Sequence, residues 1–318
     1  MRDDAIRQIC ISSVAGINEV TAPEINREPD TFTMQRFIGV LVFICFAFAQ
    51  ALAESKEETP PDDVKPLWEV GLGGFTGWLP DYPAAGENTV RVFAAPVPIY
   101  RGKILRVGGE ENRGAVSGRF INRDRFEFDV SLSAAFPVES GNNDARRDMP
   151  DLDFLFGIGP QVRFKLINEP GHRTLNLNLQ ARAVYSTDFS SISSQGYVFD
   201  PELSYSQDNV TGLDLRVTTS MGAIFATEDL MDYFYAVAPA FVTPTRPAYD
   251  ADAGYLGSNI TLGVSKRFNK RFRLLLGTRL GIHTGATNHD SPLFEDELNV
   301  SVFTAFFWSI FQSEERAR

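Results

Sequence analysis

The clearest pattern in the chain is the alternation of apolar and polar residues from Thr174 to Ser186. The apolar face consists of Leu175, Leu177, Leu179, Ala181, Ala183 and Tyr185. A period of two over this length predicts a half-buried β-strand and argues against a helix. The stretch is also long, because ordinary strands have about 5–6 residues, whereas a strand tilted through a bilayer needs roughly 9–11.

The same alternation recurs in 125–136, 154–166, 213–225 and 271–283. Repeated long strands of this kind predict a transmembrane antiparallel β-barrel, with apolar side chains toward lipid and polar side chains toward a lumen. A soluble β-sandwich alternates in the same way, but strand length and the start of the chain favour the barrel. The assigned faces predict that arginine is destabilising at Leu177 and tolerated at Asn178.

We predict an all-β, single-chain barrel over residues 67–311 with about twelve strands. The expected strands are 67–78, 89–95, 99–107, 114–121, 125–136, 153–166, 173–186, 196–206, 211–225, 254–268, 271–283 and 298–311. Because proline cannot pair within a central ladder, we place a tight turn at Pro96–Pro98. Short periplasmic turns then alternate with longer outer loops, as in bacterial barrels. The longest loop, 226–253, is expected to form an ordered lid or constriction.

Residues 34–53 have the pattern of a secretory signal peptide, with a positive residue, an apolar core and a small-residue cleavage site. Cleavage is expected between Ala53 and Glu54. Residues 1–33 are interpreted as an upstream extension from a misassigned start codon, and a cytoplasmic tail before a membrane anchor is the alternative. The acidic, proline-rich stretch 54–66 is expected to be a disordered lead-in, and 312–318 a C-terminal tail.

Composition limits the environment and the partners. The chain has 30 Lys+Arg and 41 Asp+Glu, a formal net charge of −11, which argues against a nucleic-acid partner. Both cysteines, Cys10 and Cys45, precede the expected cleavage site, so the mature chain would have no disulfide. The expected location is the cell outer membrane, in contact with its lipid and with lipopolysaccharide.

Charges of both signs lie on the polar faces of the predicted strands. They are Arg125, Glu127, Asp129, Arg163, Arg182, Arg216, Arg271, Arg273 and Arg279. A barrel of about twelve strands is intermediate in bore between filled small barrels and open porins. These charges therefore either pair into a network that fills the lumen or line a narrow pore, and three arginines on one strand would favour anions if a path exists.

The sequence offers little chemistry for an enzyme. The three histidines are His172, His283 and His289, and Ser291 follows His289 closely, but no third orienting group is visible. No metal-ligand spacing and no phosphate-binding glycine loop is present. We predict a protein that is not an enzyme, with no catalytic residue, no metal site and no cofactor.

Three stretches carry a family resemblance: Glu69–Gly73 leading into Pro80-Asp81-Tyr82-Pro83, then Ala95–Gly102, and Thr245–Tyr249. In this order and spacing they resemble the MipA/OmpV family, named for its MltA-interacting member, over roughly residues 67–311. The motif positions are Pro80, Asp81, Tyr82, Pro96, Pro98, Tyr100, Arg101, Gly102, Arg246, Pro247 and Tyr249. The chain departs from the family pattern at Pro83, where glycine is more usual, and in its C-terminal tail.

The resemblance implies an outer-membrane β-barrel that takes part in peptidoglycan biosynthesis. Its expected role is that of a scaffold that binds a lytic transglycosylase, which is a murein hydrolase, together with a murein synthase. Other family members resemble porins or adhesins, so a channel for small solutes and a surface adhesin are the alternatives. The lead-in 54–66 is a candidate tether for a periplasmic enzyme, and an inert spacer is the alternative.

Overall fold

The computed structural model describes residues 66–101, 105–107, 116–118, 121–122, 125–169 and 171–315. The expected signal peptide, its cleavage site Ala53–Glu54, the lead-in up to residue 65 and the motif residue Gly102 lie outside the described residues. The chain divides into two units, 1–59 and 60–318. Every described residue belongs to the second unit.

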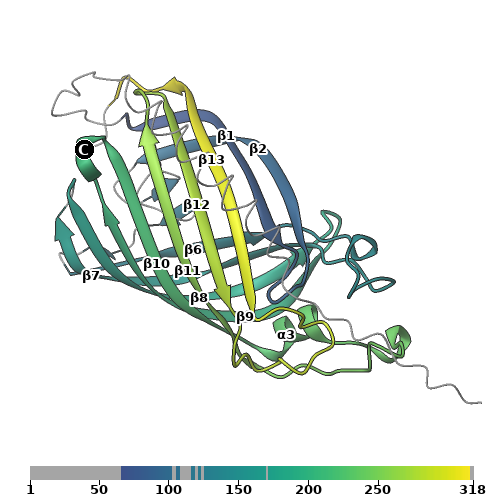
Figure 1. Cartoon of the computed structure of the whole chain (residues 1–318). Helices are drawn as coiled ribbons and strands as arrows, with labels where there is room; N and C mark the ends of the chain where they lie inside the picture. The colour runs from purple at the N-terminus through teal and green to yellow at the C-terminus, as the bar shows by residue number, and fades with distance from the viewer. Residues whose placement is uncertain are drawn as a thin grey trace, which may run out of the picture. The chain divides into compact units, whose positions relative to one another are not determined.

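The described strands form one antiparallel sheet that curls on itself (Figure 1). Its ten long strands are β1 (Trp68–Pro80), β2 (Asn88–Arg101), β6 (Phe126–Ala135), β7 (Phe154–Glu169), β8 (Arg173–Thr187), β9 (Ile192–Gln207), β10 (Leu215–Ala226), β11 (Gly254–Arg267), β12 (Phe272–Ile282) and β13 (Leu298–Gln312). The short strands are β3 (Leu105–Val107), β4 (Val116–Gly118) and β5 (Ile121–Asn122). In the sheet, β1 lies between β2 and β13, and the order ends at β4 and β5. The predicted all-β antiparallel class is confirmed.

The predicted turn at Pro96–Pro98 is wrong, because β2 runs through both prolines and pairs with β1 along its whole length. The Arg101 N–H donates to Leu67 O on the β1 side. Successive N–H groups along a strand point to opposite neighbours. An N–H at position 96 or 98, an odd number of residues from 101, would therefore point away from β1. A proline at either position therefore loses no hydrogen bond to β1.

Prolines within the other strands also lie where the ladder is interrupted. Pro160 pairs with Val130 of β6, but it has no partner in the register between β7 and β8. Pro201 pairs with Leu179 of β8, but the β9–β10 register passes over it. Each proline therefore has a regular partner strand on one side only, which is the tolerated position for a residue without an N–H.

Most other strand boundaries lie within a few residues of their predicted positions, and the exceptions are local. The predicted strand 211–225 begins later, at Leu215, because the 3-10 helix η2 (Val210–Gly212) precedes it. Asn209 and Asp214 flank this helix with φ of 50° and 54°, a backbone conformation that Asn and Asp adopt more readily than most residues. The predicted strand 114–121 corresponds to β4 and β5.

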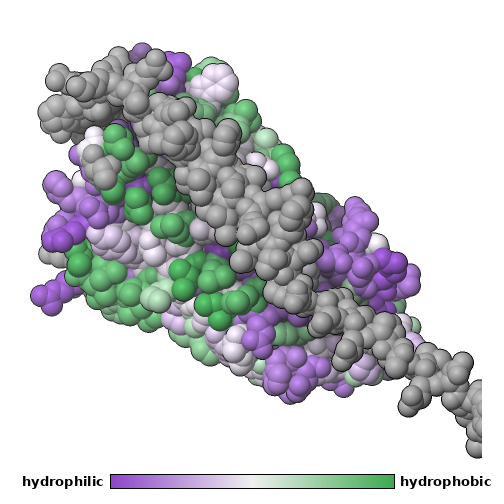
Figure 2. Space-filling view, in the orientation of Figure 1, coloured by the Kyte–Doolittle hydropathy of each residue, from purple (hydrophilic) through white to green (hydrophobic). Residues whose placement is uncertain are grey.

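The long strands bury polar residues on one face, here called the inner face, and expose apolar residues on the other, the outer face. Asn178 is 4% exposed, whereas Val92 is 75% exposed and Trp308 is 53% exposed. Figure 2 shows apolar side chains gathered over the strands and hydrophilic ones over the loops. This arrangement reverses that of a soluble sheet, whose buried face is apolar.

The long connections gather at one end of the strands, here called the loop end, and build a small apolar core there. They form a cap, defined as residues 81–87, 136–153, 227–253 and 283–297, which contains α3 (Glu228–Tyr235), η1 (Ser140–Asn142) and η3 (Pro239–Phe241). Its buried side chains pack on inner-face residues at the strand ends, among them Leu155, Val184 and Val198. The segment 227–253 is thus ordered and lies against the inner face. Each helix in the described part of the chain is too short or too polar to cross a membrane.

Candidate functional site

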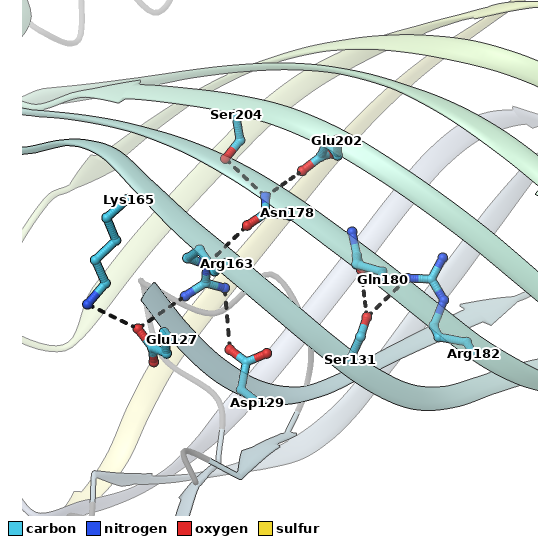
Figure 3. A network of polar contacts seen from close by, with 10 residues as sticks. All are labelled: Glu127, Asp129, Ser131, Arg163, Lys165, Asn178, Gln180, Arg182, Glu202 and Ser204. Carbon is cyan, nitrogen blue, oxygen red and sulfur yellow. Dashed lines mark hydrogen bonds and ion pairs between the residues drawn. The ribbon is translucent and has the colours of Figure 1, made fainter. Parts of the chain in front are cut away.

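A network of ion pairs covers the inner face of β6 and β7 (Figure 3). Arg163 lies 3.8 Å from Glu127 and 3.6 Å from Asp129, and Lys165 lies 3.5 Å from Glu127. Both carboxylates are almost fully buried. Glu127 is directly opposite Arg163 in the register, and Asp129 and Lys165 each lie two residues further along the same face of their strands. Strand register therefore brings opposite charges together.

The network continues onto β8 and β9 through neutral side chains (Figure 3). Asn178 accepts from Arg163 Nε at 3.1 Å and donates to Glu202 at 3.3 Å and to Ser204 at 3.2 Å. An amide can donate and accept at once, so Asn178 connects the cation of β7 to the carboxylate of β9.

Arg182 forms a second cluster closer to the loop end. Its guanidinium donates to Ser131 at 3.0 Å, to Gln180 at 2.6 Å and to Asp200 at 3.0 Å. It is 8% exposed, and its Nε is buried without a hydrogen-bond partner. The charged wall, defined as the inner face of β6 to β9, is thus largely self-paired.

Between polar residues near the strand ends, the inner face of β1, β12 and β13 carries glycines and aromatic rings. A Cβ at Gly277 would meet the Phe303 ring at 2.4 Å, and one at Gly71 would meet the Phe307 ring at 2.7 Å. The glycines therefore let both rings lie flat against neighbouring strands. Phe75 stacks beside Phe303 with ring centres 6.1 Å apart. We call this face the aromatic wall.

The other end of the strands, here called the turn end, holds a smaller polar cluster. Arg101 lies 2.6 Å from Glu69 and donates to Pro66 O at 2.9 Å. Gln312, the last residue of β13, donates to the same carboxylate at 3.3 Å. The motif residue Arg101 thus ties the start of β1 to the ends of β2 and β13.

The remaining predicted lumen charges lie in different places. Arg273 and Arg279 face inward on β12, opposite Phe307 and Ser301 of β13. Arg216 pairs with Asp208. Arg125 and Arg271 are exposed in turns just before their strands.

The motif residues 80–82 lie at the entrance to the cap and are held tightly. Asp81 accepts hydrogen bonds from Thr89 at 2.6 Å, Arg91 at 2.9 Å and Asn143 at 3.1 Å. Tyr82 is 3% exposed and donates to Leu293 O at 2.8 Å. Burial raises the pKa of Tyr82, so its hydroxyl stays a donor.

Arg146, at the centre of the cap, was not found by sequence reasoning. Its guanidinium donates to Phe234 O at 3.1 Å and Pro150 O at 3.2 Å and lies 5.7 Å from the centre of the Tyr82 ring. Burial lowers the pKa of Arg146. The only available signal was its place in a long polar loop beside Arg147, which does not distinguish a buried cation from an exposed one.

The second motif in the cap, around Arg246, connects two loops. Arg246 donates to Phe241 O at 2.9 Å and to Ala145 O at 2.8 Å. Tyr249 donates to Asn288 at 3.1 Å, while Pro247 is exposed. Motif residues far apart in the sequence are therefore joined in one cap. The β2 motif residues lie instead on the outer face of that strand; they are Pro96, Pro98 and Tyr100.

The one serine and histidine considered for catalysis do not form a pair. The Ser291 hydroxyl is 3% exposed and donates to Tyr235 O at 2.8 Å. His289 is exposed and lies 3.3 Å from Asp290. Among the described residues, no group of His, Cys, Asp and Glu could hold a metal ion.

Comparison with known proteins gives a family and distant structural likenesses. An outer-membrane channel from Pseudomonas putida F1 is 12% identical in sequence, with a TM-score of 0.42. The alignment covers 79% of this chain and 99% of the channel chain. Outer-membrane phospholipase A from Escherichia coli is 11% identical, covers 80% of this chain and 95% of its own, and has a TM-score of 0.33. Likenesses this distant carry no argument about function.

The search among curated proteins found no match. The family model described as MltA-interacting protein MipA matches residues 70–310. This range includes most of β1 and of β13, the strands between them, the cap and all of the three motif stretches except Glu69. The chain belongs to the MipA family.

Proposed function

We propose that this chain is an outer-membrane β-barrel without enzymatic activity that serves as a scaffold for murein-remodelling enzymes. The observation that carries the membrane assignment is the reversal of faces. Polar side chains are buried on the inner face, and the outer face of the ten long strands is predominantly apolar. Only a hydrocarbon surrounding makes such an outer face favourable.

Closure of the sheet into a barrel is part of this proposal. β4 pairs with β3, β5 pairs with β6, and the two short strands are close in sequence. β4 also lies next to β6. Pairing between β4 and β6 would join the two ends of the sheet and leave no exposed edge in lipid, and the count is twelve strands when β4 and β5 are taken together.

The scaffold role is favoured by what fills the barrel. The cap packs against the inner face at the loop end, and the charged wall is paired with itself rather than open to a solute. With long loops outside and short turns toward the periplasm, a murein enzyme would meet the turn end and the acidic lead-in. The family name itself describes an interaction with MltA.

Affinity capture from membranes tests the scaffold proposal. The full chain should retain a lytic transglycosylase and a murein synthase, and deleting 55–65 should weaken capture if the lead-in is the tether. The heat-modifiable gel shift of the deletion variant should match that of the full chain. Absence of both enzymes from the captured material, with a normal gel shift, would contradict the scaffold.

A channel for small solutes is the second candidate. It is favoured by two inner-face residues that are solvent-accessible, Phe93 at 54% exposure and Arg279. Single-channel conductance in planar bilayers distinguishes the two functions. A stable conductance from the full chain would favour the channel, and silence would favour the capped scaffold.

A further inference from the structure

The hairpin of β11 and β12 has a charge unlike that of the rest of the chain. From Gly254 to His283 it contains no acidic residue, although the chain as a whole has a net charge of −11. Its cations are Lys266, Arg267, Lys270, Arg271, Arg273 and Arg279. All but Arg279 lie in or beside the turn between the two strands.

Lys266 differs from the other cations in the face that it occupies. It pairs with Leu215 of β10 and Leu274 of β12, so it lies on the apolar outer face. It is 5% exposed, and its Nζ lies 5.6 Å from the centre of the Phe268 ring. Within the described part of the chain, the ammonium contacts that ring, and no carboxylate lies within ion-pair distance of it.

Other charges on the outer face of the described strands are neutralised. Glu169 and Arg173 pair with each other at the β7–β8 turn, with 2.8 Å between Arg173 Nε and Glu169. An ammonium held against apolar side chains without an anion is unfavourable. A cation–π contact offsets only part of that penalty.

The surroundings of Lys266 are those of a membrane interface. Phe268 and Phe272 have ring centres 5.9 Å apart, and Phe272 and Phe306 have ring centres 6.2 Å apart. Trp308 is the strand partner of Phe272. Aromatic residues gather where hydrocarbon meets headgroups, and a lysine stem can lie along such rings while its ammonium reaches the headgroup level.

We propose that Lys266 and the adjoining turn bind the phosphate of an anionic phospholipid in the leaflet that the turn end meets. This inference rests on the proposed membrane-spanning barrel. Asn269 holds the turn by accepting the N–H groups of Arg271 and Phe272, each at 2.8 Å. Lys270 and Arg271 are exposed beside it. The lipid phosphate supplies the anion that Lys266 lacks.

Lipid retention measured by native mass spectrometry tests the site. The refolded barrel is released from micelles that contain phosphatidylglycerol or phosphatidylcholine. Lys266→Met should lower phosphatidylglycerol retention about tenfold, the change expected from losing one charge-assisted hydrogen bond, and Lys266→Arg should restore it. Lys165→Met, which removes a lysine from the inner face, is the matched control and should retain lipid like the unaltered chain.

The outcomes distinguish a lipid site from a free-anion site and from a protein-docking site. Equal phosphatidylglycerol retention by Lys266→Met and the unaltered chain would overturn the proposal. Displacement of the lipid by millimolar inorganic phosphate would show that the site binds free anions instead of lipid. Loss of enzyme capture in Lys266→Met without loss of lipid would show that the site docks a protein instead. A barrel that retains lipid but captures no enzyme would contradict the scaffold alone, whereas absence of a heat-modifiable shift would contradict the membrane fold.

Discussion

The cap and the strands of this protein obey opposite rules of burial. The cap buries Met231 and Tyr235 at 0% and 1% exposure and leaves charges such as Arg147 and Asp144 outside, as a small soluble domain does. The strands bury Asp129 and Asn178 and expose Val92. The hydrophobic effect accounts for both patterns. Polar residues face outward where the surroundings are water, and apolar residues face outward where the surroundings are hydrocarbon.

The junction between the two regions consists of polar side chains that serve both. Asn299, near the start of β13, accepts the Ala84 N–H at 2.8 Å and donates to Ala85 O at 2.9 Å. It is 4% exposed. A buried amide satisfied on both sides fixes the cap turn 81–87 relative to the strand. The comparison therefore predicts that cap and strands can be destabilised separately.

The largest effect is expected from Arg146→Met in the cap. The variant loses the hydrogen bonds from the guanidinium to Phe234 O, Pro150 O and the Ser140 hydroxyl, together with the contact with Tyr82, and it leaves Phe234 O without that donor. We expect the free energy of cap opening to fall by about 4 kcal/mol. Limited proteolysis should then cut within 136–153 or 227–253, while the heat-modifiable shift of the strands persists.

Arg147→Met is the matched control for this experiment. Arg147 is adjacent in the chain, but its side chain is 63% exposed and pairs with an exposed Asp144. An exposed ion pair of this kind contributes little, so proteolysis should be unchanged. If Arg146→Met also lost the heat-modifiable shift, cap and strands would be one cooperative unit and the comparison would fail.

The next largest effect is expected in the strands, from Leu177→Arg on the outer face. Arginine near the bilayer midplane destabilises a barrel by about 2–4 kcal/mol, and we expect a loss toward the middle of that range in urea unfolding from vesicles. Phe93→Arg places the same charge on the inner face at a residue that is 54% exposed, and should change the unfolding free energy little. Equal losses would contradict the assigned faces.

Much of the strand architecture could be predicted from alternation, because the period of two is a local property of the chain. The extent of β2 could not be predicted in this way. Pro96 and Pro98 are tolerated in β2 because their positions direct an N–H away from β1, and this depends on the pairing of the two strands. Alternation also predicts the face of Asn178 correctly but not its packing. Asn178→Arg would lose the hydrogen bonds to Arg163 and Glu202 and place a second guanidinium beside Arg163, so we expect it to be destabilising, unlike the tolerance that alternation alone predicts.

The candidate site was less predictable than the fold. Sequence reasoning named Asp81, Tyr82 and Arg246 from a family resemblance, but their meeting in one cap depends on contacts between loops distant in the chain. Arg146 had no periodic signal, because loop residues follow no fixed spacing. Its role follows only from the carbonyls that surround it.

A smaller effect is expected from pH, through His283 at the base of the cap. His283 is 7% exposed, with Nδ1 3.0 Å from Leu256 O, and burial lowers its pKa. The opened cap would take up a proton at the ordinary pKa of about 6.5 and the closed cap only at lower pH. Closure should therefore be fully stable above that pH and weaken as pH falls below it, by on the order of 1 kcal/mol.

Hydrogen exchange of α3 at pH 7.5 and 5.5 measures this dependence. Exchange should be faster at pH 5.5, after correction for its intrinsic rate, and His283→Gln should remove most of the difference. His289→Gln is the control, because that side chain is 60% exposed. A difference that persists in His283→Gln would assign the pH response to another group.

The smallest effect on stability is expected from the edge of β2. In the described part of the sheet, this strand pairs with β3 only through Tyr100 and Arg101, and Pro96 and Pro98 remove two donors from the rest of that edge. Replacing both prolines with valine leaves the β1 ladder intact, so unfolding should change by no more than about 0.5 kcal/mol. The restored N–H groups should instead promote pairing between chains.

Chemical cross-linking in micelles detects that pairing as an increase in dimer for the double variant. Ala94→Val is the matched control, since it adds a β-branched residue on the same face without adding a donor, and its dimer fraction should not change. A loss of stability well above about 0.5 kcal/mol in the double variant would show that the prolines shape the strand itself. An unchanged dimer fraction would show that this edge is already covered, in which case the contrast between cap and strands extends to a closed sheet without a free edge.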